Sequence, residues 1–254
     1  MDDVARIQRS GFFAFLEDVN AQGDGFPLFG FVHITALVLC AVLVIGMCLW
    51  CRSLAKDKQW LMSRVIIALA LVLESIRQAS FPLVHGHYWL PHLPLHMCGL
   101  ALFIEAFHGC KPNKFTGEIL YALVLPGATA AMLFPDWTLY PIWHFYPLQS
   151  FTIHSLHITL AVTLVISGNV KPTPKNLWCP VLFLAVVVPP IFLFNRIYGT
   201  NFFFINAGSE GSPLEVLISI FGNPGFLLPY AGILASLWVV MYLPWRKLFL
   251  RGRR

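Results

Sequence analysis

The segment "FVHITALVLCAVLVIGMCLWC", residues 31–51, decides the fold class. It contains no Asp, Glu, Lys or Arg, and an apolar run of about 18 residues or more is typical of a helix that crosses a bilayer. The whole chain shares this character, because 57% of its 254 residues are hydrophobic and only 11% are charged. Soluble domains carry about 25% charged residues. The sequence therefore predicts an all-α polytopic membrane protein and excludes a water-soluble domain.

About seven apolar runs follow one another along the chain, of which the third is short: 31–51, 60–80, 95–107, 117–134, 149–166, 178–198 and 225–243. Neither an internal repeat nor a low-complexity linker separates them. We therefore expect one bundle of about seven transmembrane helices over residues 31–244. A basic tail, residues 245–254, follows it.

The N-terminal segment, residues 1–30, begins with two acidic residues and lacks the basic start of a signal peptide. Its stretch "GFFAFLEDV" has two structural interpretations. It forms a short interfacial helix with Phe12, Phe13 and Leu16 on its apolar side, or it simply packs ahead of the first span.

Lysine and arginine gather in alternate loops and in the tail, at Arg52, Lys56 and Lys58, at Lys111 and Lys114, at Lys171 and Lys175, and at Arg246, Lys247, Arg251, Arg253 and Arg254. Cytoplasmic loops of membrane proteins are enriched in these residues. The pattern predicts a cytoplasmic C-terminus and an external N-terminus in a cell membrane, which we take to be the cytoplasmic membrane of a bacterium. The net charge of +5 then reflects topology, and we expect no nucleic-acid partner.

On this map eight of the nine histidines fall on the outer side: His33, His85, His87, His92, His96, His144, His154 and His157. Only His108 falls on the inner side. The other polar groups at membrane depth lie toward the outer side as well: Glu74, Arg77 and Gln78 late in the second run, Asn195 and Arg196 late in the sixth, and Asn201 just beyond it. Such residues are candidates for function because a charge in the membrane is costly. Two alternatives remain: a structural polar knot between helices two, five and six, and snorkelling of Arg196.

Cys98 in "PHLPLHMCGL", residues 91–100, is the one cysteine that shares the outer half with the histidines. Pro94 suits the first turn of a helix, which places Cys98 near a helix N-terminus, where a thiolate is favoured. A nearby imidazole can act as its base. The histidines of "HSLH", His154 and His157, are one turn apart and can face the same cavity. An inert small cysteine and a zinc site of His96, His154 and His157 are the weaker alternatives.

Four segments resemble the YwaF-like family of integral membrane proteins: "LPLHMC" at 93–98, "LPGATAAMLFPD" at 125–136, "QSFTIHSLHITL" at 149–160 and "NRIYGTNFFF" at 195–204. That family is similar to the vertebrate transmembrane protein 164, a phospholipid acyltransferase. The resemblance spans roughly residues 33–230. It implies that Cys98 accepts the acyl group and that His154 assists it, with His157 as the second choice. Family members also tend to carry a histidine early in the first helix, which matches His33, and a glutamate and an arginine in the second, which match Glu74 and Arg77. The "INAGSEGSP" segment, residues 205–213, departs from the family pattern in a loop that caps the site.

The combined interpretation is a lipid acyltransferase that moves a fatty acyl chain between phospholipids through a thioester on Cys98. His154 would take the thiol proton, and His96, Gln78 or Arg77 would stabilise the oxyanion. The expected partners are membrane phospholipids, lysophospholipids and the bilayer, and no cofactor is expected. Two alternatives stay open: a lipid hydrolase with the same residues, and a non-enzymatic transporter or binding protein with an outward-facing pocket. A retinal protein is excluded because residues 225–243 contain no lysine.

Overall fold

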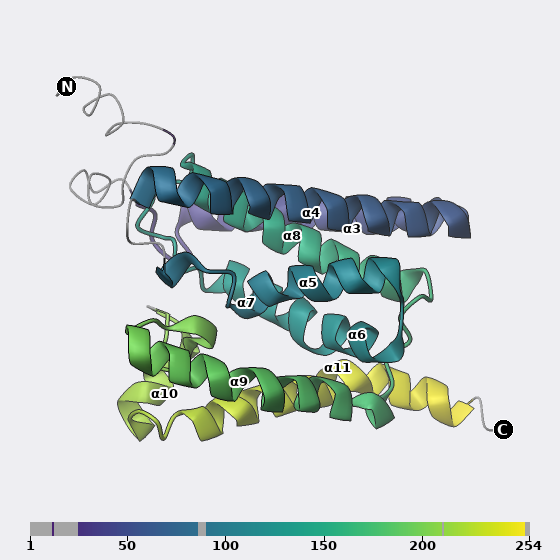
Figure 1. Ribbon diagram of the computed structural model, residues 1–254. Coiled ribbons are helices and arrows are strands. Elements are labelled where there is room, and N and C mark those ends of the chain that lie inside the picture. Colours follow the sequence, from purple (N-terminus) through teal and green to yellow (C-terminus); the bar gives the residue numbers. More distant parts are fainter. Residues whose placement is uncertain (1–11, 13–24, 86–89, 210, 252–254) are drawn as a thin grey trace.

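The protein is described here by a computed structural model that covers residues 12, 25–85, 90–209 and 211–251. Its regular elements in these ranges are all helical (Figure 1). The predicted interfacial helix around Phe13 and Leu16 lies outside the described residues. The structure thus confirms the all-α fold class.

Six segments are long and apolar enough to cross a membrane: Phe31–Ser53, Lys56–Ser80, Lys114–Leu133, Phe145–Ile166, Pro174–Tyr198 and Leu227–Trp245. The third predicted run forms only a 14-residue helix, α5 (Met97–Cys110), which is too short to span a hydrocarbon core of about 30 Å. The described residues therefore hold six full-length candidate spans, and the short helix α5 stands in the place of the third of the seven predicted spans. A further short helix that the sequence did not indicate, α10 (Pro213–Phe221), precedes the last span.

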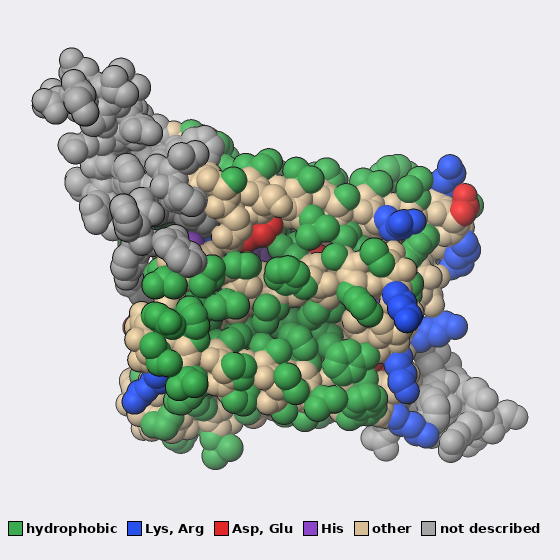
Figure 2. All heavy atoms as spheres, viewed as in Figure 1, with side chains coloured by type: hydrophobic (Ala, Val, Ile, Leu, Met, Phe, Trp, Pro, Cys, Tyr) green, Lys and Arg blue, Asp and Glu red, His purple; other side chains and the backbone are tan. Residues whose placement is uncertain are grey.

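The outer surface of the bundle is apolar, as contact with lipid requires. On α3 (Phe31–Ser53), Val38, Leu39, Val42 and Leu43 are each more than half exposed. Figure 2 shows hydrophobic side chains over the flank, with Lys and Arg gathered mainly at the end where α11 (Leu227–Arg251) ends. This distribution is that of a multi-pass membrane protein.

In Figure 1 the helices lie in three tiers. The first holds α3, α4 (Lys56–His85) and α8 (Phe145–Ile166). The second holds α5 and the span formed by α6 (Lys114–Ile119), η2 (Leu120–Val124) and α7 (Leu125–Leu133), and the third holds α9 (Trp178–Tyr198), α10 and α11. Because α8 packs against α3, α4 and α7, it carries side chains into the interior between the first two tiers.

The α6–η2–α7 span is fixed to α11 by polar contacts at a helix irregularity. Residues Leu120–Val124 form a π-turn, and Pro126 follows it. Because proline has no N–H, it cannot donate to the carbonyl four residues earlier, that of Ala122. The indole Nε1–H of Trp238 on α11 donates to this carbonyl instead, at 2.8 Å. The hydroxyl of Tyr121 likewise donates to the Met241 carbonyl at 2.8 Å.

The chain ahead of α5 is irregular and folds back over the start of that helix. A 3₁₀ turn, Leu90–His92, is followed by Pro94, and α5 begins at Met97. Pro94 therefore lies outside the helix, and its prediction as a first-turn residue is wrong by three positions. A Cβ at Gly99 would lie 2.5 Å from the Pro94 carbonyl oxygen, so only glycine permits this close approach.

Candidate active site

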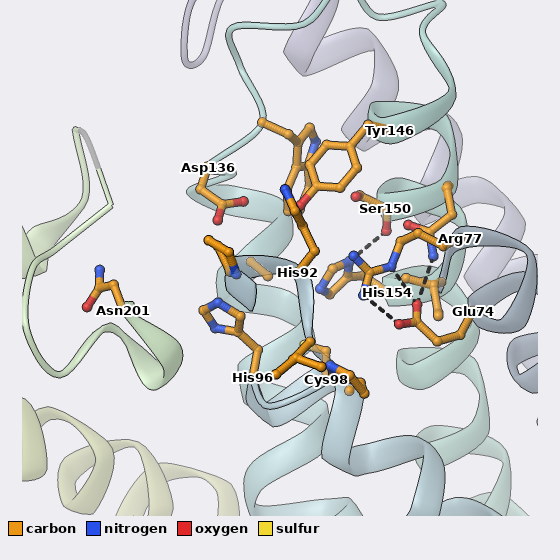
Figure 3. Close-up of a pocket in the computed structure, with 18 of the residues that line it drawn as sticks. Glu74, Arg77, His92, His96, Cys98, Asp136, Tyr146, Ser150, His154 and Asn201 are labelled. Carbon is orange, nitrogen blue, oxygen red and sulfur yellow. Dashed lines mark hydrogen bonds and ion pairs between the residues drawn. The ribbon is translucent and has the colours of Figure 1, made fainter. Parts of the chain in front are cut away.

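A cavity of about 370 Å³ opens at the end of the bundle opposite the basic loops (Figure 3). The late part of α4, the start of α5, the connection between α7 and α8, and the segment after α9 all contribute to its wall. Its polar lining consists of Glu74, Arg77, His92, His96, Cys98, Asp136, Tyr140, Tyr146, Gln149, Ser150, His154 and Asn201. The cavity thus unites six of the residues that the sequence predicts for the site: Cys98, His154, His96, Glu74, Arg77 and Asn201.

Cys98 is the second residue of α5 and lines the cavity as a free thiol. The first backbone N–H groups of a helix have no partner within the helix, and the helix dipole is positive at this end. The side chain of His96, the N-cap residue of α5, makes no capping hydrogen bond. The start of α5 therefore favours negative charge on the sulfur, or on an oxygen bound beside it, while the burial of the sulfur opposes that charge.

His154 reaches the same cavity from α8, with its ring orientation fixed on two sides. Its Nδ1 lies 2.6 Å from the carbonyl oxygen of Ser150. A carbonyl oxygen only accepts hydrogen bonds, so Nδ1 carries the proton and Nε2 of the neutral ring is the basic atom. Trp137 stacks on the ring at 5.4 Å between centroids. His154 is thus held in the tautomer that a general base needs.

His157 does not face the cavity with His154, contrary to the prediction. It is fully buried, and its Nδ1 lies 2.7 Å from Oε1 of Glu105 on α5. Three residues along a helix correspond to a rotation of about 300°, so the two imidazoles point about 60° apart and His157 turns toward α5. The described residues contain no group of three His, Cys, Asp or Glu side chains that could hold a metal. The two histidines therefore have different surroundings and different roles.

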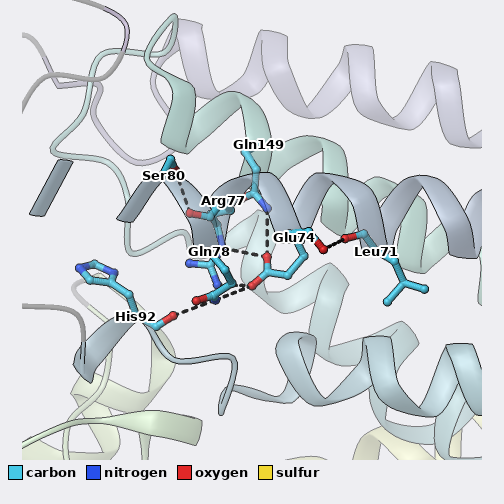
Figure 4. A network of polar contacts seen from close by, with 8 residues as sticks. Leu71, Glu74, Arg77, Gln78, Ser80, His92 and Gln149 are labelled. Atoms are coloured by element: carbon cyan, nitrogen blue, oxygen red, sulfur yellow. Dashed lines mark hydrogen bonds and ion pairs between the residues drawn. The ribbon is translucent and has the colours of Figure 1, made fainter. Parts of the chain in front are cut away.

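Glu74 is the centre of a polar network (Figure 4). Its carboxylate accepts from Arg77 Nε at 2.8 Å and Nη2 at 2.5 Å, from Gln78 Nε2 at 2.8 Å and from Gln149 Nε2 at 3.3 Å. The Gln78 amide also donates to the His92 carbonyl at 3.0 Å. The network joins α4 to α8 and to the segment before α5. Among the described residues, none of α9, the sixth predicted helix, belongs to this network. The polar contacts therefore join α4, α8 and the segment before α5, and not helices two, five and six as predicted.

Three further predicted residues, His33, Asn195 and Arg196, are not part of the cavity lining. The Nδ1 of His33 accepts the Phe29 N–H at 3.0 Å, and its Nε2 donates to the Met132 carbonyl at 2.9 Å, which ties α3 to the end of α7. Asn195 is buried and bonds to Thr200 and to the backbone of Phe202. Arg196 is exposed. The contacts of His33 and Asn195 are therefore structural.

The connection between α7 and α8 contributes polar residues that the sequence analysis missed. Burial raises the pKa of Asp136 above the ordinary value of a carboxyl group, while its own backbone N–H and Arg77 oppose the shift. Burial, with the help of Asp136, raises the pKa of Tyr140 to about 12. Asp136 closes the "LPGATAAMLFPD" segment, but no spacing rule relates it to Cys98. The only indication of Asp136 in the sequence was its place in a segment that carries the family resemblance.

His96 is a neutral hydrogen-bonding group at this site. Burial and, to a smaller extent, the Arg77 charge lower its pKa to about 4. Its ring lies edge-on to Phe202 at 5.1 Å between centroids. At neutral pH the imidazole therefore has one N–H to donate and adds no net charge beside Cys98.

Six candidate spans and a buried thiol–imidazole cavity define a multi-pass membrane protein with a polar site near one membrane face. The chain belongs to the TMEM164 family, whose model matches residues 28–242. It is also similar to an uncharacterized protein of Treponema pallidum (strain Nichols), with 28% identity over 166 residues. That alignment covers 65% of this chain and 66% of the relative, just under two thirds of its length. No solved structure matches the chain, and these matches do not confirm the YwaF-like affiliation.

Proposed function

We propose that this protein is a cysteine-dependent lipid acyltransferase that moves a fatty acyl chain between membrane phospholipids and lysophospholipids. One observation carries the proposal: Cys98 at the start of α5 and His154 on α8 line the same cavity. A thiol, a base of fixed tautomer and a helix N-terminus are the components that acyl transfer through a covalent intermediate requires. Membership of the TMEM164 family agrees with a membrane location for the reaction.

In the first half-reaction the Cys98 thiol proton passes to His154 Nε2 as the sulfur attacks the ester carbonyl of the donor lipid. The carbon–oxygen bond to the glycerol then breaks, and the leaving oxygen takes the proton from His154. In the second half-reaction the acceptor hydroxyl gives its proton to His154 and attacks the thioester. The carbon–sulfur bond breaks, and the sulfur recovers the proton, so each step is balanced without a cofactor.

The structure narrows the choice of the oxyanion donor. Both hydrogens of the Gln78 amide are used, by Glu74 and by the His92 carbonyl, so Gln78 is a supporting residue. His96 has an N–H available in its neutral form, and the backbone N–H groups at the start of α5 lie beside Cys98. One well-placed donor lowers the barrier by roughly 3–4 kcal/mol.

The function is tested with the purified protein in liposomes that contain a phospholipid with a labelled acyl chain and an unlabelled lysophospholipid. We expect the label to appear in a new diacyl lipid made from the acceptor. Labelled free fatty acid as the only product would identify a lipid hydrolase with the same residues. Binding of lipid without either product would contradict the proposal and favour a transporter or binding protein.

The proposed organisation has an external segment 1–30, a transmembrane domain 31–244 and a basic cytoplasmic end 245–254, of which residues 245–251 continue α11. This topology places Cys110, which is exposed at the end of α5, on the cytoplasmic side. A membrane-impermeant maleimide added to intact cells should therefore leave Cys110 unlabelled and should label it after permeabilisation.

The control for this experiment is an Ala207→Cys variant, because Ala207 is exposed in the segment between α9 and α10. Its new thiol should react from outside in intact cells. Labelling of Cys110 together with protection of this variant would reverse the orientation, and the cavity would then open to the cytoplasm.

A further inference from the structure

A second pair of titratable groups, Glu105 and His157, lies beside the proposed catalytic pair and has no part in the mechanism above. The exposed fraction of the Glu105 side chain is 1% and that of His157 is 0%. Apart from the 2.7 Å contact between Nδ1 and Oε1, Glu105 Oε2 and His157 Nε2 have no hydrogen-bond partner among the described residues. Two buried polar atoms without hydrogen-bond partners are energetically costly. The pair is therefore a candidate for a functional role.

The pair lies behind His154 as seen from the cavity. The His154 and His157 rings are 6.2 Å apart between centroids and nearly perpendicular, at 81°. Glu105 and Cys98 are both on α5 and are separated by seven residues, or about 10 Å along the helix axis. The order from the cavity inward is therefore His154, then His157, then Glu105, and the carboxylate lies on the side of His154 that faces away from the cavity.

We propose that Glu105, through His157, supplies the counter-charge that stabilises His154 when His154 takes the thiol proton. In this arrangement a neutral His157 donates its Nδ1–H to the Glu105 carboxylate. The two unpartnered atoms, Oε2 and Nε2, are then both lone-pair acceptors, and the pair has a net negative charge. Positive charge on the adjacent His154 imidazole relieves this unfavourable state. Glu105 and His157 thus act as positioning residues, and the inference rests on the proposed role of His154.

The other charges around the site do not replace this contribution. On α4 the Glu74 carboxylate is bound by Arg77 through two nitrogens. Asp136, in the connection between α7 and α8, also faces the Arg77 charge. On α8 Tyr146 lines the cavity, and ahead of α5 His96 is neutral near pH 7. One turn beyond Glu105, the Nδ1 of His108 is paired with Thr116 Oγ1 at 2.8 Å. Glu105 is thus the carboxylate whose bonded partner is a second histidine.

The test is the pH dependence of Cys98 alkylation in the purified full-length protein, followed with iodoacetamide and read out by mass spectrometry of the Cys98 peptide. In the Glu105→Gln variant the glutamine oxygen still accepts the His157 Nδ1–H, so only the charge is removed. Because the imidazolium of His154 is then less stable, we expect alkylation at pH 7 to slow by about tenfold and the acid limb of the profile to move to lower pH.

The matched control is Glu118→Gln. Glu118 is also a buried glutamate, 2% exposed, but it lies at the opposite end of the bundle, where Thr173 N and Asn176 Nδ2 donate to it. This variant should give the wild-type profile. A wild-type profile for Glu105→Gln, an equal displacement in both variants, or faster alkylation of Cys98, as expected if Glu105 acts mainly by direct repulsion of the Cys98 thiolate, would overturn the inference.

The same preparations separate this inference from the proposed function. If Cys98→Ala abolishes lipid acyl exchange while Glu105→Gln leaves the alkylation profile unchanged, the acyltransferase assignment stands and the role of Glu105 fails. If Cys98→Ala retains exchange but Glu105→Gln displaces the profile, the charge coupling stands and the acyltransferase mechanism fails.

Discussion

The Cys98→Ala variant is expected to lose acyl exchange between phospholipids completely while remaining folded. The sulfur is the proposed nucleophile and leaving group, and a methyl group cannot take either role. The loss in stability should be about 1 kcal/mol, because one small thiol is removed from the wall of a cavity. The measurement is the transfer of a labelled acyl chain in liposomes, together with a hydroxylamine-sensitive label on the protein that the variant lacks.

Two further variants sharpen this result. Cys98→Ser should also be nearly inactive, because an alkoxide is far harder to form near neutral pH than a thiolate. Cys110→Ala is the matched control, since this cysteine is exposed at the other end of α5; it should retain both the label and the activity. Full exchange in the Cys98 variants, or a hydroxylamine-sensitive label on Cys40, would show that the Cys98 thiol only fills space.

The second large effect is expected for Arg77→Met. This change removes the guanidinium that binds Glu74. The Glu74 carboxylate, in a residue that is only 8% exposed, then keeps only the amides of Gln78 and Gln149 as hydrogen-bond donors. An uncompensated buried charge is destabilising by about 3–5 kcal/mol. The free energy of unfolding, measured by denaturant titration of the detergent-solubilised protein, should fall by this amount.

The paired variant Glu74→Gln/Arg77→Met tests the cause of the loss. It removes both charges and keeps an amide that can still bond to Gln78 and Gln149. Most of the stability should return, whereas acyl exchange should remain low if the Arg77 charge also acts on the lipid. A single Arg77→Met variant as stable as wild type would show that the ion pair does not hold α4 to its neighbours.

The fold was largely predictable because apolar length alone identifies membrane helices. The limits of the runs 31–51 and 178–198 agree with α3 and α9 within two residues. The irregular elements were not predictable in this way. The π-turn at Leu120–Val124 depends on contacts with α11, and α10, at nine residues, is too short to stand out as an apolar run.

For the site, the loop charges predicted the depth of each residue in the membrane, whereas the direction in which each side chain points around its helix was not predictable. The outer position of His33, Asn195 and Arg196 was inferred from the loop charges, yet none of the three lines the cavity. The direction in which a side chain points from its helix depends on how that helix packs against its neighbours. The sequence of a single helix does not specify this packing. Glu105 could have been found, because it is the one acidic residue of the third apolar run, and a charge at membrane depth is a candidate for function by default.

The shortness of α5 has a consequence for how a lipid meets the protein. Its 14 residues rise about 21 Å, against about 30 Å for the hydrocarbon core. With its last turn at the basic face, α5 has its first turn roughly 9 Å below the opposite boundary of the hydrocarbon core. The irregular segment before α5 lines a hollow there. A phospholipid substrate of the proposed acyltransferase would then lower its ester carbonyl into the protein by a small vertical step while its tails remain among those of its neighbours. The truncated helix would remove the need to extract that substrate from its leaflet, so the barrier to its entry would be that of this short step.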